Sequence, residues 1–177
     1  MQMRPRRHYV WLSRSTAPRP LPFEGGFFGR VGRVTNPRAD ERLKILVYSD
    51  DADTRSQVML GLGRRPHPDL PEVEYVEVAT EPVVLQQMDS GRIDLAILDG
   101  EAVPAGGMGI AKQMKDEVYR CPPILVLTGR PQDAWLATWS RADGAVSHPI
   151  DPLQLAETVL RLLRGALEPV ETPAVGR

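Results

Sequence analysis

The sequence predicts an α/β fold in which five consecutive strand–helix units build one doubly wound parallel sheet. From residue 43 onward, short apolar runs rich in Val, Ile and Leu alternate with amphipathic segments. Uninterrupted runs of this kind are typical of parallel strands that are covered on both faces. Strand–helix–strand crossovers are right-handed almost without exception, so five such units in succession form an open sheet with helices on both faces.

The elements follow one another in a regular order along the chain. The expected strands are residues 43–48, 73–79, 93–98, 124–127 and 145–147. The expected helices are residues 52–62, 82–90, 108–120, 131–141 and 152–164. The last helix has the clearest signals, because Asp151 can cap its first N–H groups, Pro152 suits the first helical position and Gly165 predicts a stop.

Length and composition restrict the class of protein. The chain has 177 residues, of which 42% are hydrophobic and 25% charged, enough apolar material for one globular core and too much for global disorder. No run approaches the roughly 18 apolar residues of a membrane-spanning helix, and no secretory signal opens the chain. The single cysteine, Cys121, excludes an internal disulfide and a cysteine metal cage, which fits the cytoplasm.

The first forty residues differ from the rest in charge and composition. They hold eight Arg against two acids, five of the 17 prolines and all three phenylalanines, without an apolar period. We therefore expect residues 1–41 to be a basic, aromatic-bearing extended tail, 42–165 a folded domain, and 166–177 a short flexible C-terminal tail. The short segment after Gly165 leaves no room for a helix-turn-helix or catalytic output domain, so output is expected through protein contact.

The basic tail admits three interpretations. Nucleic-acid binding is disfavoured, because no RNA- or DNA-binding module accompanies the arginines. Docking of Phe23, Phe27 and Phe28 into grooves of a larger assembly is favoured, since exposed aromatic residues without a partner are a liability. The third interpretation is an over-long start assignment.

Polar residues follow four of the five expected strands, at the edge of the sheet where ligands bind in open α/β folds. The loops that begin there contain Ser49, Asp50, Asp51, Asp53, Asp99, Gly100, Glu101, Thr128, Gly129, His148 and Pro149, of which all but the two glycines and the proline have polar side chains. Each of them alone is an ordinary polar loop residue. Their joint placement predicts an oxygen-rich pocket, which favours a hard cation such as Mg²⁺.

The stretch from about Leu43 to Arg164 resembles the receiver domain of two-component response regulators. The resemblance lies in the segments LKILVYSDDADTR, GRIDLAILDGE, PPILVLTGR and GAVSHPIDPLQLAETVLRLL. It implies a flavodoxin-like (βα)5 fold with strand order 2-1-3-4-5. It also implies Asp99 as the phosphoacceptor, with Thr128 and His148 in the positions that sense the phosphoryl group. The implied Mg²⁺ site is weak and consists of Asp50, Asp99 and the backbone carbonyl of Glu101, with Asp51 as an alternative ligand if the loop shifts by one residue.

Three departures from the family pattern indicate a degenerate receiver. The family's pair of acids after the first strand falls on Ser49 and Asp50, so one carboxylate is missing. His148 replaces a lysine, and its imidazole is shorter and mostly neutral at pH 7. Ala145 stands where the family often has an aromatic residue that swings inward on activation. Losing a carboxylate and a cation weakens phosphoryl transfer, so the expectation is a non-enzymatic contact module.

Two other functions compete with this interpretation. The first is a single-domain response regulator that a histidine kinase switches by phosphorylating Asp99. The second is a flavodoxin-like cofactor binder or a phosphohydrolase on the same sheet. It is disfavoured because the chain has neither a GxGxxG fingerprint nor a DxDx[TV] motif.

A narrower resemblance concerns the partner. The runs ILVYSD, DLAILDGE, GGMGIAKQ and CPPILVLTGRP are similar to those of an orphan actinobacterial receiver family associated with type I NADH dehydrogenase, respiratory complex I. This implies an accessory subunit on the cytoplasmic side, peripheral at the inner face of the plasma membrane through its partner. Trp135 and Trp139 lie four residues apart on the expected fourth helix and share one face. If exposed they would anchor an interface; the alternative is a role in the core.

Overall fold

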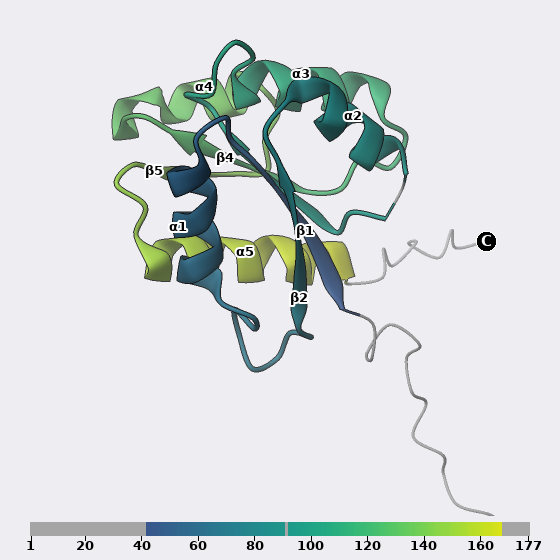
Figure 1. Ribbon diagram of the computed structural model, residues 1–177, viewed down its shortest axis with the longest axis vertical. Coiled ribbons are helices and arrows are strands. Elements are labelled where there is room, and N and C mark those ends of the chain that lie inside the picture. Colours follow the sequence, from purple (N-terminus) through teal and green to yellow (C-terminus); the bar gives the residue numbers. More distant parts are fainter. Residues whose placement is uncertain (1–41, 91, 168–177) are drawn as a thin grey trace, which may run out of the picture. The chain divides into compact units, whose positions relative to one another are not determined.

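The computed structural model describes residues 42–90 and 92–167 (Figure 1). The predicted tails therefore lie almost wholly outside the described residues, and with them Phe23, Phe27 and Phe28. The domain boundaries at residues 41 and 165 stay predictions.

Five parallel strands form one sheet in the order β2-β1-β3-β4-β5, which confirms the predicted fold and strand order. The strands are β1 (Leu43–Tyr48), β2 (Val73–Val78), β3 (Leu95–Asp99), β4 (Ile124–Thr128) and β5 (Gly144–Ser147). Every residue of β3 and β4 is buried, because these central strands are covered on both faces. In the edge strand β2 only the two end residues, Val73 and Val78, are buried, and the residues between them are partly or fully exposed.

Helices cover both faces of the sheet (Figure 1). One face carries α1 (Ala52–Leu62) and α5 (Pro152–Leu167); the other carries α2 (Glu81–Asp89), α3 (Gly107–Glu117) and α4 (Ala134–Trp139). Each face has its own apolar cluster. Val58 and Val159 belong to the first, and Val84, Ile110 and Met114 to the second. This packing brings the loops that follow β1, β3, β4 and β5 to one edge of the sheet.

Three predicted helices have a wrong end, each for a local reason. Helix α3 stops at Glu117 instead of residue 120, because Val118 has the extended ψ of 116°. Helix α5 continues through Gly165 to Leu167, because an interior glycine costs a helix only about 1 kcal/mol. The segment expected as one helix over 131–141 is a short 3₁₀ turn over Pro131–Asp133 followed by α4. Helix α4 ends early, since Arg141 has the left-handed φ of 61° that terminates a helix.

The third strand begins at Leu95, two residues later than expected. Asp94 accounts for the difference, because its carboxylate accepts a hydrogen bond from the backbone N–H of Lys44 at 2.8 Å. Its own N–H donates to the Lys44 carbonyl at 2.9 Å. A side chain therefore takes the place of one strand-to-strand bond at the start of the β1–β3 pairing.

Candidate functional site

Asp99 is the centre of the candidate site. It is the last residue of β3 and only 4% exposed. The Ser49 hydroxyl, at the end of the neighbouring strand β1, donates to Asp99 Oδ2 at 2.7 Å. The backbone N–H of Glu101 donates to Asp99 Oδ1 at 3.0 Å. Both carboxylate oxygens are therefore hydrogen-bonded within the protein.

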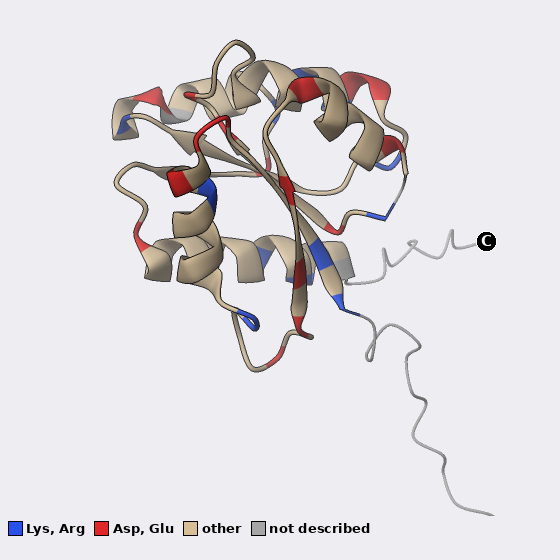
Figure 2. Cartoon of the chain, in the orientation of Figure 1, with Lys and Arg blue, Asp and Glu red and all other residues tan. Residues whose placement is uncertain are grey.

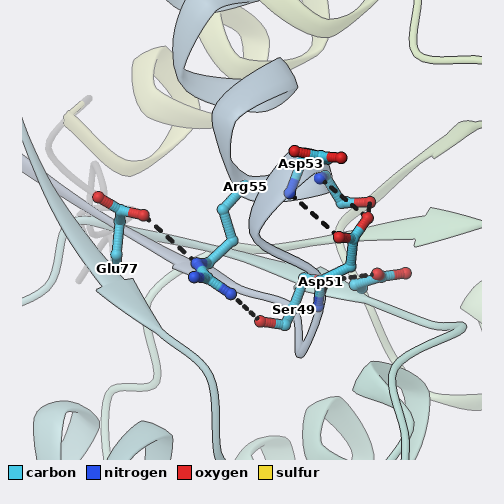
Figure 3. A network of polar contacts seen from close by, with 7 residues as sticks. Ser49, Asp51, Asp53, Arg55 and Glu77 are labelled. Atoms are coloured by element: carbon cyan, nitrogen blue, oxygen red, sulfur yellow. Dashed lines mark hydrogen bonds and ion pairs between the residues drawn. The ribbon is translucent and has the colours of Figure 1, made fainter.

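Ser49 is held in place by α1 and β2. Its hydroxyl accepts the N–H of Asp51 at 3.1 Å. Arg55, on α1, donates from Nη1 to the Ser49 carbonyl at 2.7 Å and pairs through Nε with Glu77 on β2 at 3.3 Å (Figure 3). The Arg55 guanidinium thus lies between Ser49 and Glu77, and both of its contacts are structural.

The acids after β1 do not act as a group. Asp51 caps α1, because its carboxylate accepts hydrogen bonds from the N–H groups of Asp53 and Thr54 and from the Thr54 hydroxyl (Figure 3). The Thr54 hydroxyl is the main cause that lowers the pKa of Asp51, followed by the Asp53 N–H. Asp50 is exposed. Figure 2 shows this acidic loop leading into α1.

The predicted magnesium site gains no additional side-chain ligand from the fold. Within residues 42–90 and 92–167, no three or more His, Cys, Asp or Glu side chains gather as a metal site. Asp51 could serve as a ligand only by giving up the α1 cap. The site of Asp50, Asp99 and the Glu101 carbonyl therefore stays a prediction, with two carboxylates where the family pattern supplies three.

Thr128 and His148 lie at the same edge as Asp99. Thr128 ends β4 and is 1% exposed, and β4 pairs with β3 so that Asp99 is opposite Leu127. The N–H of His148 donates to the Thr128 carbonyl at 2.8 Å, which carries the β4–β5 pairing beyond the strands. The structure thus brings together strand ends that are up to 99 residues apart in the numbering of the chain.

The side chain of Glu101 contributes to the site in a way that the sequence analysis missed. A Cβ built on Gly129 would lie 2.7 Å from Glu101 Cδ and within 2.9 Å of both carboxylate oxygens. The Glu101 carboxylate therefore lies against Gly129, the residue after Thr128. The one sequence signal for this contact is a glycine directly after the fourth strand.

Tyr48 is a second residue that the sequence analysis missed. It is the buried last residue of β1, and its hydroxyl donates to the carbonyl of Ala105 in the loop between β3 and α3 at 2.6 Å. Burial is the main cause that raises the pKa of Tyr48, and the charge of Asp50 adds to it. An aromatic hydroxyl at the end of the apolar run over residues 45–47 was the available signal in the sequence.

Trp135 and Trp139 are both exposed on α4, with 65% and 55% of their surfaces accessible. The alternative that they belong to the core is wrong. Exposed tryptophans on one helix face are typical interface anchors. Among the described helices, none is long and apolar enough to cross a membrane.

Comparisons with known proteins agree with the fold. No family model matches the sequence. Two proteins from Mycobacterium tuberculosis strains, each named an uncharacterized response regulatory protein, are 67% identical over 128 residues, which cover 72% of this chain and 96% of each relative. The solved structure of a Vibrio cholerae chemotaxis protein is 26% identical, with a TM-score of 0.55 over 69% of this chain and 99% of that one.

A two-component response regulator from Clostridium difficile has the same fold. It aligns with a TM-score of 0.60 over 72% of this chain and 100% of that chain, at 20% identity.

Proposed function

The chain belongs to the response regulators, and we propose that it is a stand-alone receiver module that acts by protein contact and without phosphorylation. Its proposed partner is respiratory complex I, NADH:quinone oxidoreductase, for which it would be an accessory subunit on the cytoplasmic side of the plasma membrane. Under this proposal the module has no catalytic activity of its own.

The observation that carries the proposal is the bond from Ser49 to Asp99. Phosphoryl transfer depends on positioning and on neutralising the charge of the transferred group. A buried serine hydroxyl supplies a hydrogen bond but no negative charge for a metal ion. His148 supplies an imidazole, which is shorter in reach than the lysine of the family pattern, at the position that would pair with the phosphoryl group. The pocket therefore retains the nucleophile, Asp99. It lacks a carboxylate for the metal ion and the lysine that would pair with the phosphoryl group.

A magnesium ion would be held by the carboxylates of Asp50 and Asp99 and by the Glu101 carbonyl. In a receiver site the ion supplies neutralisation of phosphoryl charge. The residues present fit such an ion only in part, since Ser49 is not a carboxylate and Asp51 is committed to the cap of α1. Weak binding is the expected result.

The exposed pair Trp135 and Trp139 is the proposed contact surface. Partner identity rests on the similarity of four sequence segments to receivers associated with complex I. The unplaced Phe23, Phe27 and Phe28 of the basic tail are proposed as further contacts with the same assembly.

The proposal is tested by co-purification from the protein's own cells. Membranes would be solubilised in a mild detergent, the tagged full-length chain recovered and its companions identified by mass spectrometry. Subunits of complex I should accompany the wild type and Asp99→Asn equally, because that substitution removes only the phosphoacceptor. Recovery free of complex I would remove the proposed partner, and loss of the complex in Asp99→Asn would overturn phosphorylation independence.

The second candidate function is a single-domain response regulator switched by a histidine kinase. The retained positions of Asp99 and Thr128 favour it. Incubation of the chain with acetyl phosphate and Mg²⁺, followed by intact mass measurement, separates the two functions. A stable phosphoryl adduct in the wild type that is absent in Asp99→Asn would support the switch and overturn the proposed one.

A further inference from the structure

We propose that residues 168–177 bind back onto the domain, in a groove between the C-terminal ends of α3 and α5. The groove lies at the edge of the sheet opposite the one that carries Asp99, so its occupant is independent of the proposed function. The segment, which the sequence predicts to be a flexible tail, would then have a binding site on its own chain.

The groove has a volume of about 610 Å³ and lies at the amino ends of β4 and β5. Volumes of about 300–1,000 Å³ are typical of pockets that hold a ligand. Its walls come from the end of α3 and the loop after it, from the residues before β4 and β5, and from the last turns of α5. The walls outside α5 consist of Lys115, Cys121, Pro123 and Asp143.

The wall next to α3 is a closed polar pair. Lys115 Nζ lies 2.6 Å from Asp143 Oδ2 and donates to the Pro122 carbonyl at 3.3 Å. The same Asp143 oxygen accepts the N–H of Ile124 at 2.7 Å. The Lys115 side chain is only 14% exposed, so its charge is already compensated, and the pair holds α3 to the starts of β4 and β5.

Arg161 is the cation of the wall that α5 supplies. A Cβ built on Gly144 would lie 3.3 Å from Arg161 Nη2, so the guanidinium lies over the start of β5. Among the described residues Arg161 takes part in no ion pair, whereas Arg164, three residues further along α5, pairs with Asp69. The groove therefore presents one uncompensated positive charge to an occupant.

The rest of the groove is apolar. Pro123 and Leu162 contribute hydrocarbon. Cys121 contributes a partly buried thiol whose pKa is raised mainly by burial, and a protonated thiol packs as a small apolar group. Gly165 leaves the α5 side open, because no described atom lies within 4 Å of a Cβ built there. The groove accordingly suits a segment that combines apolar side chains with an acid.

The segment after α5 fits this groove by position. Helix α5 ends at Leu167, directly after Ala166 in the groove wall. Pro169 disfavours a helical backbone at Glu168, which favours an end of the helix at the rim of the groove. An extended chain covers about 3.3 Å per residue, so residues 168–171 span up to about 13 Å, enough to reach across a groove of this volume.

The same segment fits by chemistry. Its sequence, EPVETPAVGR, contains two acids and three apolar residues. Under the proposal a glutamate of the segment pairs with Arg161, and its valines cover Leu162. Because the segment is joined to the groove wall, its effective concentration there is in the mM range. A contact that would be weak between separate molecules is then occupied most of the time.

The test uses Cys121, because it is the one cysteine of the chain and lines the groove. The full-length protein is alkylated with iodoacetamide, an uncharged reagent, and the adduct is followed by intact mass. Val170→Ser combined with Val175→Ser changes no charge and should expose the thiol, so alkylation should be roughly tenfold faster than in the wild type. Val103→Ser is the matched control, because Val103 is an exposed valine in the loop between β3 and α3, and it should react as wild type.

Arg161→Gln tests the ionic part of the contact. Loss of a nearby cation would by itself make the thiol less acidic and slow its alkylation, whereas release of the segment should make alkylation faster. A faster reaction in Arg161→Gln therefore supports the proposal, and an equal or slower one contradicts it.

Two further measurements identify the occupant. In the wild type, NMR should show contacts between the methyl groups of Val170 or Val175 and those of Leu162, and their absence would overturn the proposal. The alkylation rate should not depend on protein concentration. A rate that falls as the concentration rises would place the segment in the groove of a second copy and overturn binding within one chain, and equal rates in the wild type and the double valine variant would overturn the proposal as a whole.

Discussion

Ser49 and Asp99 are joined across β1 and β3 by a hydrogen bond of 2.7 Å from the serine hydroxyl to carboxylate Oδ2. Both residues are buried. The serine hydroxyl is a neutral hydrogen-bond donor to the buried carboxylate. A second acid at this position would repel Asp99 unless a metal ion bound between them.

Ser49→Asp should make the stability of the protein depend on magnesium. Two buried carboxylates side by side repel each other, which we expect to lower the free energy of unfolding by about 1–3 kcal/mol in the absence of metal. Mg²⁺ should restore it. Urea unfolding with and without Mg²⁺ measures the effect, and Ser49→Ala is the control, since it removes the donor without adding a ligand. Equal unfolding of Ser49→Asp with and without Mg²⁺ would contradict this prediction.

Asp51→Ala should destabilise the protein at neutral pH by removing the α1 cap. Because the pKa of Asp51 is lowered from 3.8 in the folded state, its contribution to stability is present above that value and lost as the pH falls through the folded pKa. The difference from wild type should therefore shrink in acid, and urea midpoints across that range measure it. Asp51→Ser keeps a capping oxygen and should retain part of the stability without this pH dependence. A difference that stays constant from neutral to acid pH would argue against the cap.

Tyr75→Phe should make the free energy of unfolding depend less on pH in the alkaline range. The Tyr75 hydroxyl donates to the Gly63 carbonyl at 2.6 Å, and burial raises the pKa of Tyr75 from 10.0 to about 12. Between these values the unfolded chain has lost a proton that the folded chain keeps, so wild-type stability falls as the pH rises. Chemical unfolding across this window measures the slope. Tyr119→Phe, at an exposed position, should follow wild type; the same slope in Tyr75→Phe would refute the assignment.

Two glycines of α3 should respond oppositely to alanine. A Cβ at Gly107 would lie 2.6 Å from the Asp99 carbonyl oxygen, whereas nothing lies within 4 Å of one at Gly109. Gly107→Ala should lower the free energy of unfolding by about 1–3 kcal/mol through overpacking. Gly109→Ala should raise it by up to about 1 kcal/mol through helix propensity. Urea unfolding of the pair checks both, and equal effects would mean that α3 does not start against the backbone of Asp99.

Trp135→Ala and Trp139→Ala should weaken partner binding with little effect on folding. Since both side chains are mostly exposed, each change should alter the free energy of unfolding by less than about 1 kcal/mol. Affinity for the proposed partner, purified complex I, should fall at least roughly tenfold, as for interface hot spots. Leu60→Ala is the control, because Leu60 is exposed on α1, over the other face of the sheet. Unchanged affinity in both tryptophan variants would remove α4 from the contact surface.

The fold was predictable because the apolar runs match buried parallel strands one for one. The predicted cap of α5 is confirmed, since Asp151 accepts the N–H of Leu153 at 2.9 Å. Helix ends were less predictable. A glycine at position 165 predicts the end of a helix. Helix α5 nevertheless continues to Leu167, because Leu162 and Leu163 pack against the core.

The sequence predicted which site residues lie at the same edge of the sheet, because the ends of the strands determine that placement. It did not predict the side-chain contacts between them. The order of strands places Asp99, Thr128 and His148 at one edge, and a sequence pattern can specify that. The contact of Glu101 with Gly129 depends on the direction of a side chain between strands, and so does the bond from Tyr48 to Ala105. Neither direction follows from local spacing, because both depend on tertiary packing.

The hydrogen bond between Tyr48 and Ala105 holds the segment leading into α3 against the end of β1. A conformational change that spreads from Asp99 to α3 would have to break the hydrogen bond from the Tyr48 hydroxyl to the Ala105 carbonyl. The buried hydroxyl oxygen would then be left without a hydrogen-bond partner. Together with Ala145 at the position where the family pattern often has an aromatic residue, this bond supports the proposed role, in which the module binds a partner without a phosphorylation-driven change.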